Sequence, residues 1–251
     1  MHKAQECLYT SFLPANCSVS NAVNLVLNGT QAYALSGHLD NDSRNYLFSA
    51  LLSLSEAISG LNKCLWSWST VKLYYSVFYA LRAYLASNNY CVFYIGSKPM
   101  GIFAQAGSSP TRLDGTTHKV VLARFSNINP NHFILSQEID LINPFDWLMA
   151  RREEANYKNS RFWEPLSPVH FSKIENVGLR PLIKEYCGPD HTLYLFDKDH
   201  AMLAYPLHVI REVITLLKTK GTYLCEEDIK YLKSYLCDKM GPFPELHSLL
   251  S

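Results

Sequence analysis

Residues 69–86 read STVKLYYSVFYALRAYLA, and this stretch decides the fold class. Apolar side chains recur along it at helical spacing, in a stripe formed by Val71, Tyr75, Phe78 and Leu85. Further apolar residues lie beside that stripe, so the predicted helix is apolar over a wide arc. Such a helix is typical of the centre of a helical bundle. The sequence therefore predicts a mainly α-helical protein.

A second amphipathic helix is predicted just before this stretch, over residues 43–61. Its apolar side chains step by four, three, four and three positions, at Leu47, Leu51, Leu54, Ile58 and Leu61. We expect Asp42 or Ser43 to be its N-cap, because a side-chain oxygen there can accept hydrogen bonds from the first turn. Before it, a short helix is predicted near residues 20–27.

Small β pieces are predicted between later helices. Two apolar runs within residues 90–106 flank Gly96 and indicate a β-hairpin, and a short helix is expected over residues 117–125. Asn143 followed by Pro144 is typical of a helix start, and that helix is expected to run to about residue 157.

The last third of the chain predicts one more hairpin and two more helices. Residues 192–205 are expected to form the hairpin, Pro206 to begin a helix, and the acidic residues 226–228 to open the last one. The resulting division is an N-terminal extension (1–41), a helical domain (42–160) and a mostly helical C-terminal accessory region (161–251).

Composition narrows the class of function. The 251 residues are 48% hydrophobic and 18% charged, with a net charge of only +1, so an extended basic surface for duplex DNA is not expected. No apolar run approaches the roughly 18 residues of a membrane span. The seven cysteines form no CxxC pair, and no signal-like segment opens the chain, which predicts free thiols in the cytoplasm.

Motifs for metals and cofactors are not found. Metal-ligand residue types crowd one region, at Cys187, Asp190, His191, Asp197, Asp199 and His200. Their spacing matches no closed zinc site, and an Asp-rich turn is the expected structure. Neither GxxxxGK[ST] nor GxGxxG occurs. No cofactor and no metal are therefore predicted.

Three features in one order resemble the HEPN (higher eukaryotes and prokaryotes nucleotide-binding) superfamily across roughly residues 42–160. The first is the tyrosine-rich helix YYSVFYALRAYL, residues 74–85, paired with the helix before it. The second is His118 at the start of a helix. The third is the segment RREEANY, residues 151–157. The resemblance implies a HEPN-like helical bundle.

The resemblance also implies an activity. Many HEPN proteins are metal-independent endoribonucleases that use an Arg followed, four to six residues later, by a His, and Arg112 and His118 fit that spacing. A histidine can remove the proton of a ribose 2′-OH, and an arginine can stabilise the charge on the phosphoryl oxygens. Such enzymes act as toxins of toxin–antitoxin pairs or as antiviral defence effectors. A homodimer or a silencing protein partner is implied, with RNA as substrate.

Five further residues are candidates for binding the RNA. They are basic or aromatic and fall in the same predicted domain: Arg82, Lys119, Arg151, Arg152 and Tyr157. Each has a structural alternative. A buried Arg82 would need several carbonyl partners or a carboxylate, which Glu56, Glu153 or Glu154 could supply. Charged helix ends are commonly solvated, and Tyr157 would then close the core.

Two other classes of function compete with the nuclease. Leu113 and Gly115 depart from the HEPN nuclease pattern, and they favour a non-catalytic HEPN-fold subunit of a larger bacterial defence or regulatory complex. In that case Arg112 would be a solvated loop residue, His118 would bond locally at its helix start, and an apolar patch would be exposed for protein–protein interaction. The third class is an unrelated helical protein.

Overall fold

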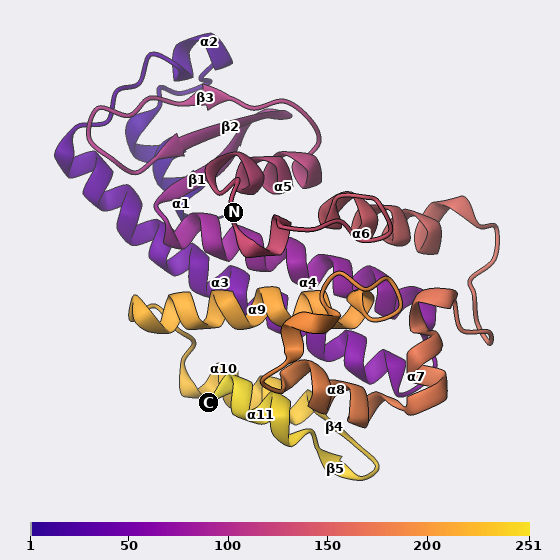
Figure 1. Cartoon of the computed structure of the whole chain (residues 1–251). Coiled ribbons are helices and arrows are strands. Elements are labelled where there is room, and N and C mark those ends of the chain that lie inside the picture. Colours follow the sequence, from indigo (N-terminus) through magenta and orange to yellow (C-terminus); the bar gives the residue numbers. More distant parts are fainter. Residues whose placement is uncertain (1) are drawn as a thin grey trace. The chain divides into compact units, whose positions relative to one another are not determined.

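The computed structural model describes residues 2–251, and the fold is mainly helical, as the sequence predicts (Figure 1). The chain divides into two compact units built from interleaved segments. Unit 1 contains the chain up to Tyr46, Leu81–Asn129 and Leu216–Tyr223. Unit 2 contains Leu47–Ala80, Pro130–Thr215 and Leu224–Ser251.

Three long helices contribute residues to both units, and α9 (Ala201–Thr219) is one of them. Helix α4 spans Trp66–Ser87 and confirms the prediction made from its apolar stripes. Helix α3 spans Gly29–Leu61, so the predicted start near residue 43 is wrong. The physical reason is a capping box: Asn28 Oδ1 accepts the backbone N–H of Gln31 at 2.9 Å, and Gln31 Oε1 accepts that of Asn28 at 3.0 Å.

Asp42 is a helix cap, but of a different helix from the one predicted. It lies inside α3, and its carboxylate is buried. Its two oxygens accept the backbone N–H groups of Lys3 at 2.8 Å and Ala4 at 2.9 Å, in the first turn of α1 (Lys3–Cys7). A carboxylate in this place satisfies two orphan donors and suits the helix dipole. Asp42 therefore fixes the amino-terminal helix within unit 1.

Unit 1 also contains a small antiparallel sheet. The predicted hairpin is confirmed as β1 (Tyr90–Ile95) and β2 (Lys98–Phe103), with a third short strand, β3 (Thr111–Arg112), beside β2. The remaining elements are a π-helical turn η1 (Leu8–Phe12), α2 (Val19–Ala22) and α5 (Thr117–Ile128). Helix α2 is shorter than predicted, and α5 starts where the sequence predicts.

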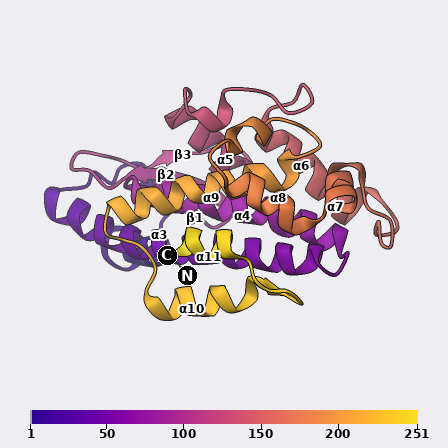
Figure 2. The ribbon, with the colours of Figure 1, turned by 60° about the horizontal axis from the view of Figure 1, so that its bottom comes forward.

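Unit 2 contains the predicted helix after Asn143. Helix α6 spans Pro144–Glu153, Asn143 Oδ1 accepts the backbone N–H of Phe145 at 3.0 Å, and a π-helical turn η3 (Glu154–Lys158) continues the helix. The other elements are η2 (Phe133–Leu135), η4 (Val169–Phe171), α7 (Ser172–Val177), α8 (Leu179–Cys187), η5 (His191–Tyr194), α9 (Ala201–Thr219), α10 (Glu226–Tyr235), β4 (Cys237–Asp238), β5 (Gly241–Pro242) and α11 (Pro244–Leu250). Helices α8 and α10 pack on α11 (Figure 2).

The predicted second hairpin, residues 192–205, is wrong. These residues form the 3-10 turn η5, a short connection and the first turn of α9, and Pro206 lies inside α9 instead of beginning it. All five residues from Ala201 to Tyr205 are buried. A short apolar run that is buried on every side has no periodicity to separate helix from strand. The last predicted helix, opened by three acidic residues, is confirmed as α10.

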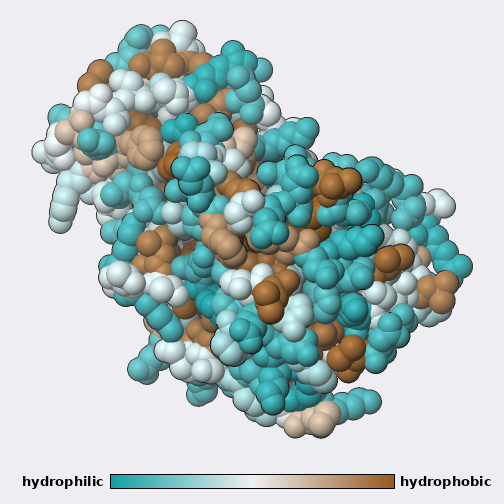
Figure 3. All heavy atoms as spheres, viewed as in Figure 1, coloured by the Kyte–Doolittle hydropathy of each residue, from teal (hydrophilic) through white to brown (hydrophobic). Residues whose placement is uncertain are grey.

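The surface is polar with scattered apolar residues. On the face shown in Figure 3, exposed apolar residues form small patches separated by hydrophilic ones. All seven cysteines are free thiols. None of the helices within residues 2–251 combines the length and the apolar character that crossing a bilayer requires.

Candidate functional site

The predicted catalytic pair lies in unit 1, on two elements joined by a short loop. Arg112 ends β3, where it is exposed and pairs through its backbone with Met100 of β2. His118 is the second residue of α5 and is half-buried. Residues 113–116 connect them, and Gly115 has a φ of +113°, which favours glycine over other residues. The glycine therefore permits the sharp turn between strand and helix.

The amino terminus of α5 has the properties of an anion site. Thr116 occupies the N-cap position with extended backbone, but its side chain makes no capping hydrogen bond, and the first turn contains no acidic residue. The first backbone N–H groups and the helix dipole therefore favour a negatively charged ligand. His118 and Lys119 belong to this turn, and Lys119 is exposed.

Arg82 belongs to the core of unit 1. It is 9% exposed, donates from Nη2 to the Tyr46 hydroxyl at 2.5 Å, and lies 4.2 Å from the centre of that ring. The adjoining cavity, partly lined by Asp42, measures about 20 Å³, which is room for a water molecule but not for a phosphate. Burial raises the pKa of Tyr46, although Arg82 acts to lower it. A tyrosine hydroxyl, and not one of the predicted glutamates, thus receives this hydrogen bond.

Arg151, Arg152 and Tyr157 lie together in unit 2, on α6 and η3. The Arg152 guanidinium is 5.4 Å from the ring centre of Tyr157, and it lies 5.6 and 5.9 Å from the rings of Tyr74 and Tyr75. Arg151 forms an ion pair with the Glu154 side chain at 3.1 Å. Tyr157 is 72% exposed, so it does not close the core. The predicted binding residues are thus divided, with Lys119 and Arg82 in unit 1 and these three in unit 2.

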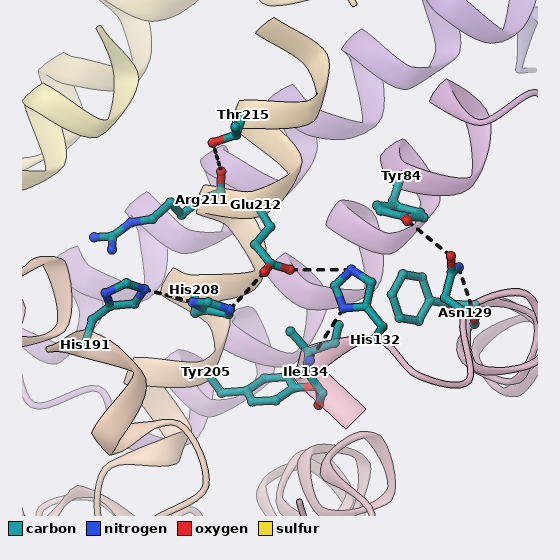
Figure 4. Close-up of polar contacts among 11 residues, drawn as sticks. Tyr84, Asn129, His132, Ile134, His191, Tyr205, His208, Arg211, Glu212 and Thr215 are labelled. Carbon is teal, nitrogen blue, oxygen red and sulfur yellow. Dashed lines mark hydrogen bonds and ion pairs between the residues drawn. The ribbon is translucent and has the colours of Figure 1, made fainter. Parts of the chain in front are cut away.

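Three histidines and one glutamate in unit 2 contact one another in a row, which we call the histidine chain (Figure 4). The sequence analysis did not predict it. His208 and Glu212 are one turn apart on α9, and their side chains approach to 3.2 Å. On one side, His191 Nε2 is 3.1 Å from His208 Nδ1. On the other side, His132 Nε2 is 3.6 Å from the second Glu212 oxygen.

Every ring nitrogen of this chain faces a protein group. His191 Nδ1 donates to the Gly188 carbonyl at 2.9 Å, and His132 Nδ1 accepts the backbone N–H of Ile134 at 3.5 Å. The remaining nitrogens face each other or Glu212. A general acid or base needs a nitrogen that can reach the substrate. We call this histidine chain closed because each ring nitrogen contacts a protein group, while the Glu212 side chain remains 33% exposed.

The pKa shifts of Glu212 and His191 follow from their contacts within the histidine chain and from burial. Burial acts to raise the pKa of Glu212, but the hydrogen bond and charge of His208 and the charges of His132 and His191 outweigh it, so the pKa of Glu212 is lowered. Burial, and after it the positive charge of Arg211, lower the pKa of His191. The carboxylate is thus held ionised among the rings.

No metal centre is found in the described part of the chain, where no three His, Cys, Asp or Glu side chains are grouped to hold an ion. Of the crowded residues between 187 and 200, His191 joins the histidine chain and His200 Nδ1 lies 2.7 Å from the Tyr186 hydroxyl. One sequence signal could have indicated the histidine chain. His208 and Glu212 are four residues apart, which puts them on one face of a helix.

No protein-family model, curated protein or solved structure matches this chain. The HEPN resemblance therefore rests on the sequence patterns at residues 74–85, at His118 and at residues 151–157.

Proposed function

We propose that this protein is a HEPN-like, metal-independent endoribonuclease that cleaves RNA by attack of a ribose 2′-OH on the adjacent phosphate. One observation carries the proposal. The amino terminus of α5 lacks a side-chain cap, bears His118 and Lys119, and follows the exposed Arg112 by a short loop. Backbone donors, two cations and an imidazole are the groups that metal-free phosphodiester cleavage requires.

Each residue has a defined role in the proposed reaction. His118 removes the proton from the 2′ oxygen as that oxygen bonds to phosphorus. Negative charge then grows on the phosphoryl oxygens, where the Arg112 guanidinium and the N–H groups of α5 stabilise it. The bond from phosphorus to the 5′ oxygen breaks, and that oxygen takes up a proton. The products are a 2′,3′-cyclic phosphate and a 5′-OH.

A second imidazole would supply the proton for the leaving 5′ oxygen. By the HEPN resemblance, such sites form where two HEPN domains meet, so we propose a homodimer in which each copy contributes Arg112 and His118. One His118 then acts as base and its counterpart as acid. The same resemblance suggests a toxin or antiviral effector, held inactive by a partner.

A second candidate function is a non-catalytic interaction subunit. It is favoured by an exposed apolar patch in unit 2, where Leu65, Trp68 and Phe162 are 43%, 51% and 50% exposed. It is also favoured by Leu113 and Gly115, which depart from the pattern of HEPN nucleases. On this alternative, Arg112 is a solvated surface residue and the protein cleaves nothing.

The nuclease proposal is tested with an end-labelled structured RNA in buffer containing EDTA. Wild type is expected to leave 2′,3′-cyclic phosphate ends, and Arg112→Ala and His118→Ala each to lose roughly 10²- to 10⁴-fold in rate. Matched controls are Lys98→Ala, an exposed cation of the same sheet, and His38→Ala, a half-buried histidine of unit 1. Equal loss in the controls, or cleavage that persists in both site variants, contradicts the proposal.

A further inference from the structure

An open groove with exposed aromatic walls lies in unit 2. Its volume is about 740 Å³, within the range of sites for small organic ligands. The rings of Trp68 and Phe162 form its walls, in edge-to-face contact with centres 5.9 Å apart. Both side chains are about half exposed, 51% for Trp68 and 50% for Phe162. Large rings held this open are available to stack on a planar ligand.

The groove is held in place by a cap on α4. Glu164 accepts the backbone N–H of Ser67 at 2.8 Å and the Ser67 hydroxyl at 2.7 Å, in the first turn of α4. The Ser67 hydroxyl oxygen in turn accepts the backbone N–H of Trp163 at 3.1 Å. These bonds fix residues 162–164 against the helix that carries Trp68. The two rings are therefore positioned before any ligand arrives, which lowers the entropy cost of binding.

Polar side chains complete the lining. Asn156 and Asn159 line the groove, and the Asn159 amide donates to the Glu154 carbonyl at 3.3 Å. Amides can pair with the edges of nucleobases, and an adenine offers the matching donor and acceptor. Arg161 is exposed at the groove and supplies a cation for a phosphate. Both oxygens of Glu164 accept hydrogen bonds from Ser67, so this carboxylate is held against α4 and keeps its negative charge.

We propose that this groove binds an unpaired nucleotide of single-stranded RNA, with its base stacked on Trp68 and its phosphate on Arg161. The choice of RNA rests on the proposed function. Rings that stack bases, amides that read their edges and a guanidinium for the backbone are the usual parts of single-strand recognition. Leu65 and Trp68 also line a neighbouring hollow of about 240 Å³ together with Lys63. Lys63 therefore offers a second cation near Trp68, in a hollow that Glu56 also lines.

A protein partner fits the groove less well. Five of its eight lining residues are polar, whereas the centre of a protein interface is depleted in charged groups and rich in apolar contact. A partner helix would also need a continuous row of apolar pockets. The groove offers one aliphatic side chain, Leu65, beside the two rings.

The test is fluorescence anisotropy with a labelled adenylate dodecamer of RNA, performed on full-length His118→Ala protein so that cleavage does not interfere. Adding Trp68→Ala is expected to raise Kd roughly 5- to 150-fold, and Trp68→Phe to restore part of the affinity. Arg161→Ala should lower the slope of log Kd against log salt by about 0.7. Tyr33→Ala, which removes a ring that is 84% exposed in unit 1, serves as the matched control.

The outcomes separate the groove from the nuclease. Equal Kd values for Trp68→Ala and Tyr33→Ala, or no RNA binding at all, overturn the groove proposal and leave the two rings to a protein partner. Binding that depends on Trp68 while wild type cleaves no RNA supports the groove and removes the nuclease. Cleavage by wild type whose kcat/KM is unchanged by Trp68→Ala removes the groove and retains the nuclease.

Discussion

The two histidine sites of this molecule differ in what their rings can reach. His118, in unit 1, lies in the first turn of α5, whose N-cap side chain makes no hydrogen bond, and it follows the exposed Arg112 by a short loop. The chain of unit 2 contains three histidines and Glu212, and each ring nitrogen there already faces a protein group. We therefore propose the first site, and not the second, as the place of proton exchange with a ligand.

The comparison shows that a cluster of titratable side chains need not be an active site. Clusters of titratable side chains attract attention as active sites, because their pKa values are perturbed. Structural networks perturb pKa values equally well, and here the lowered pKa of Glu212 follows from its three imidazole neighbours after burial has acted the other way. A cluster of perturbed groups is therefore not by itself an active site, and the proposal for His118 rests on its place in the first turn of α5.

The largest effect on stability is expected from protonation of His170, another histidine whose ring contacts a protein group. It is 7% exposed, and its Nε2 lies 3.1 Å from the Thr70 hydroxyl. Burial, with a smaller contribution from Arg151, lowers the pKa of His170 to about 3. The unfolded chain therefore takes up a proton near pH 6.5 that the folded protein refuses until about pH 3. The free energy of unfolding should fall by about 1.4 kcal/mol per pH unit across this window as pH decreases.

The control for this slope is His170→Gln, whose amide can still donate to Thr70 but does not titrate. Urea unfolding of both proteins between pH 6.5 and 4 isolates the contribution, because all other groups are shared. The wild-type slope should exceed that of the variant by about one proton. Identical slopes would show that His170 is accessible to protons in the folded state.

A smaller effect on stability is expected from Glu212→Gln, which removes the charge at the centre of the histidine chain. The carboxylate is partly exposed, so we expect a loss of only about 1–2 kcal/mol in the free energy of unfolding at pH 7. Because the folded pKa of Glu212 is lowered, the stabilisation is present above its unfolded pKa and is lost as pH falls below about 4.5. Thermal and urea unfolding at pH 7 and pH 4 should therefore differ more in wild type. An equal pH dependence in both proteins would contradict the charged network.

The smallest effect on stability is expected for His132→Asn, because His132 is the last member of the histidine chain. The new amide oxygen can still accept the backbone N–H of Ile134, while the contact with Glu212, already long at 3.6 Å, is lost. We expect a change within about 0.5 kcal/mol, measured by urea unfolding at pH 7. A loss as large as that of Glu212→Gln would show that all members of the chain act as one unit.

Local signals in the sequence were sufficient for several elements of the fold. The apolar stripes of α4, the hairpin around Gly96 and the cap at Asn143 are each written within a few neighbouring residues. The start of α3 was also readable, in the reciprocal pair Asn28 and Gln31. The helix was instead predicted to begin near residue 43, where the regular spacing of apolar residues in 43–61 starts.

Long-range use of polar side chains was not readable from the sequence. Asp42 looks like a local cap, but it caps a helix that lies almost forty positions earlier in the chain. The histidine chain joins residues 132, 191, 208 and 212, and only the last two share a helix face. Such partnerships depend on how distant elements pack, and periodicity and spacing carry no record of that.

The difference between the two histidine sites is tested most directly by comparing two histidine variants in one assay. RNA cleavage in EDTA and urea unfolding at pH 7 are measured for His118→Ala and for His208→Ala. We predict that His118→Ala loses roughly 10²- to 10⁴-fold in cleavage rate with unchanged stability. His208→Ala should lose stability but cleave at the wild-type rate at temperatures where it is folded. Cleavage that survives in His118→Ala and disappears in folded His208→Ala would contradict the account.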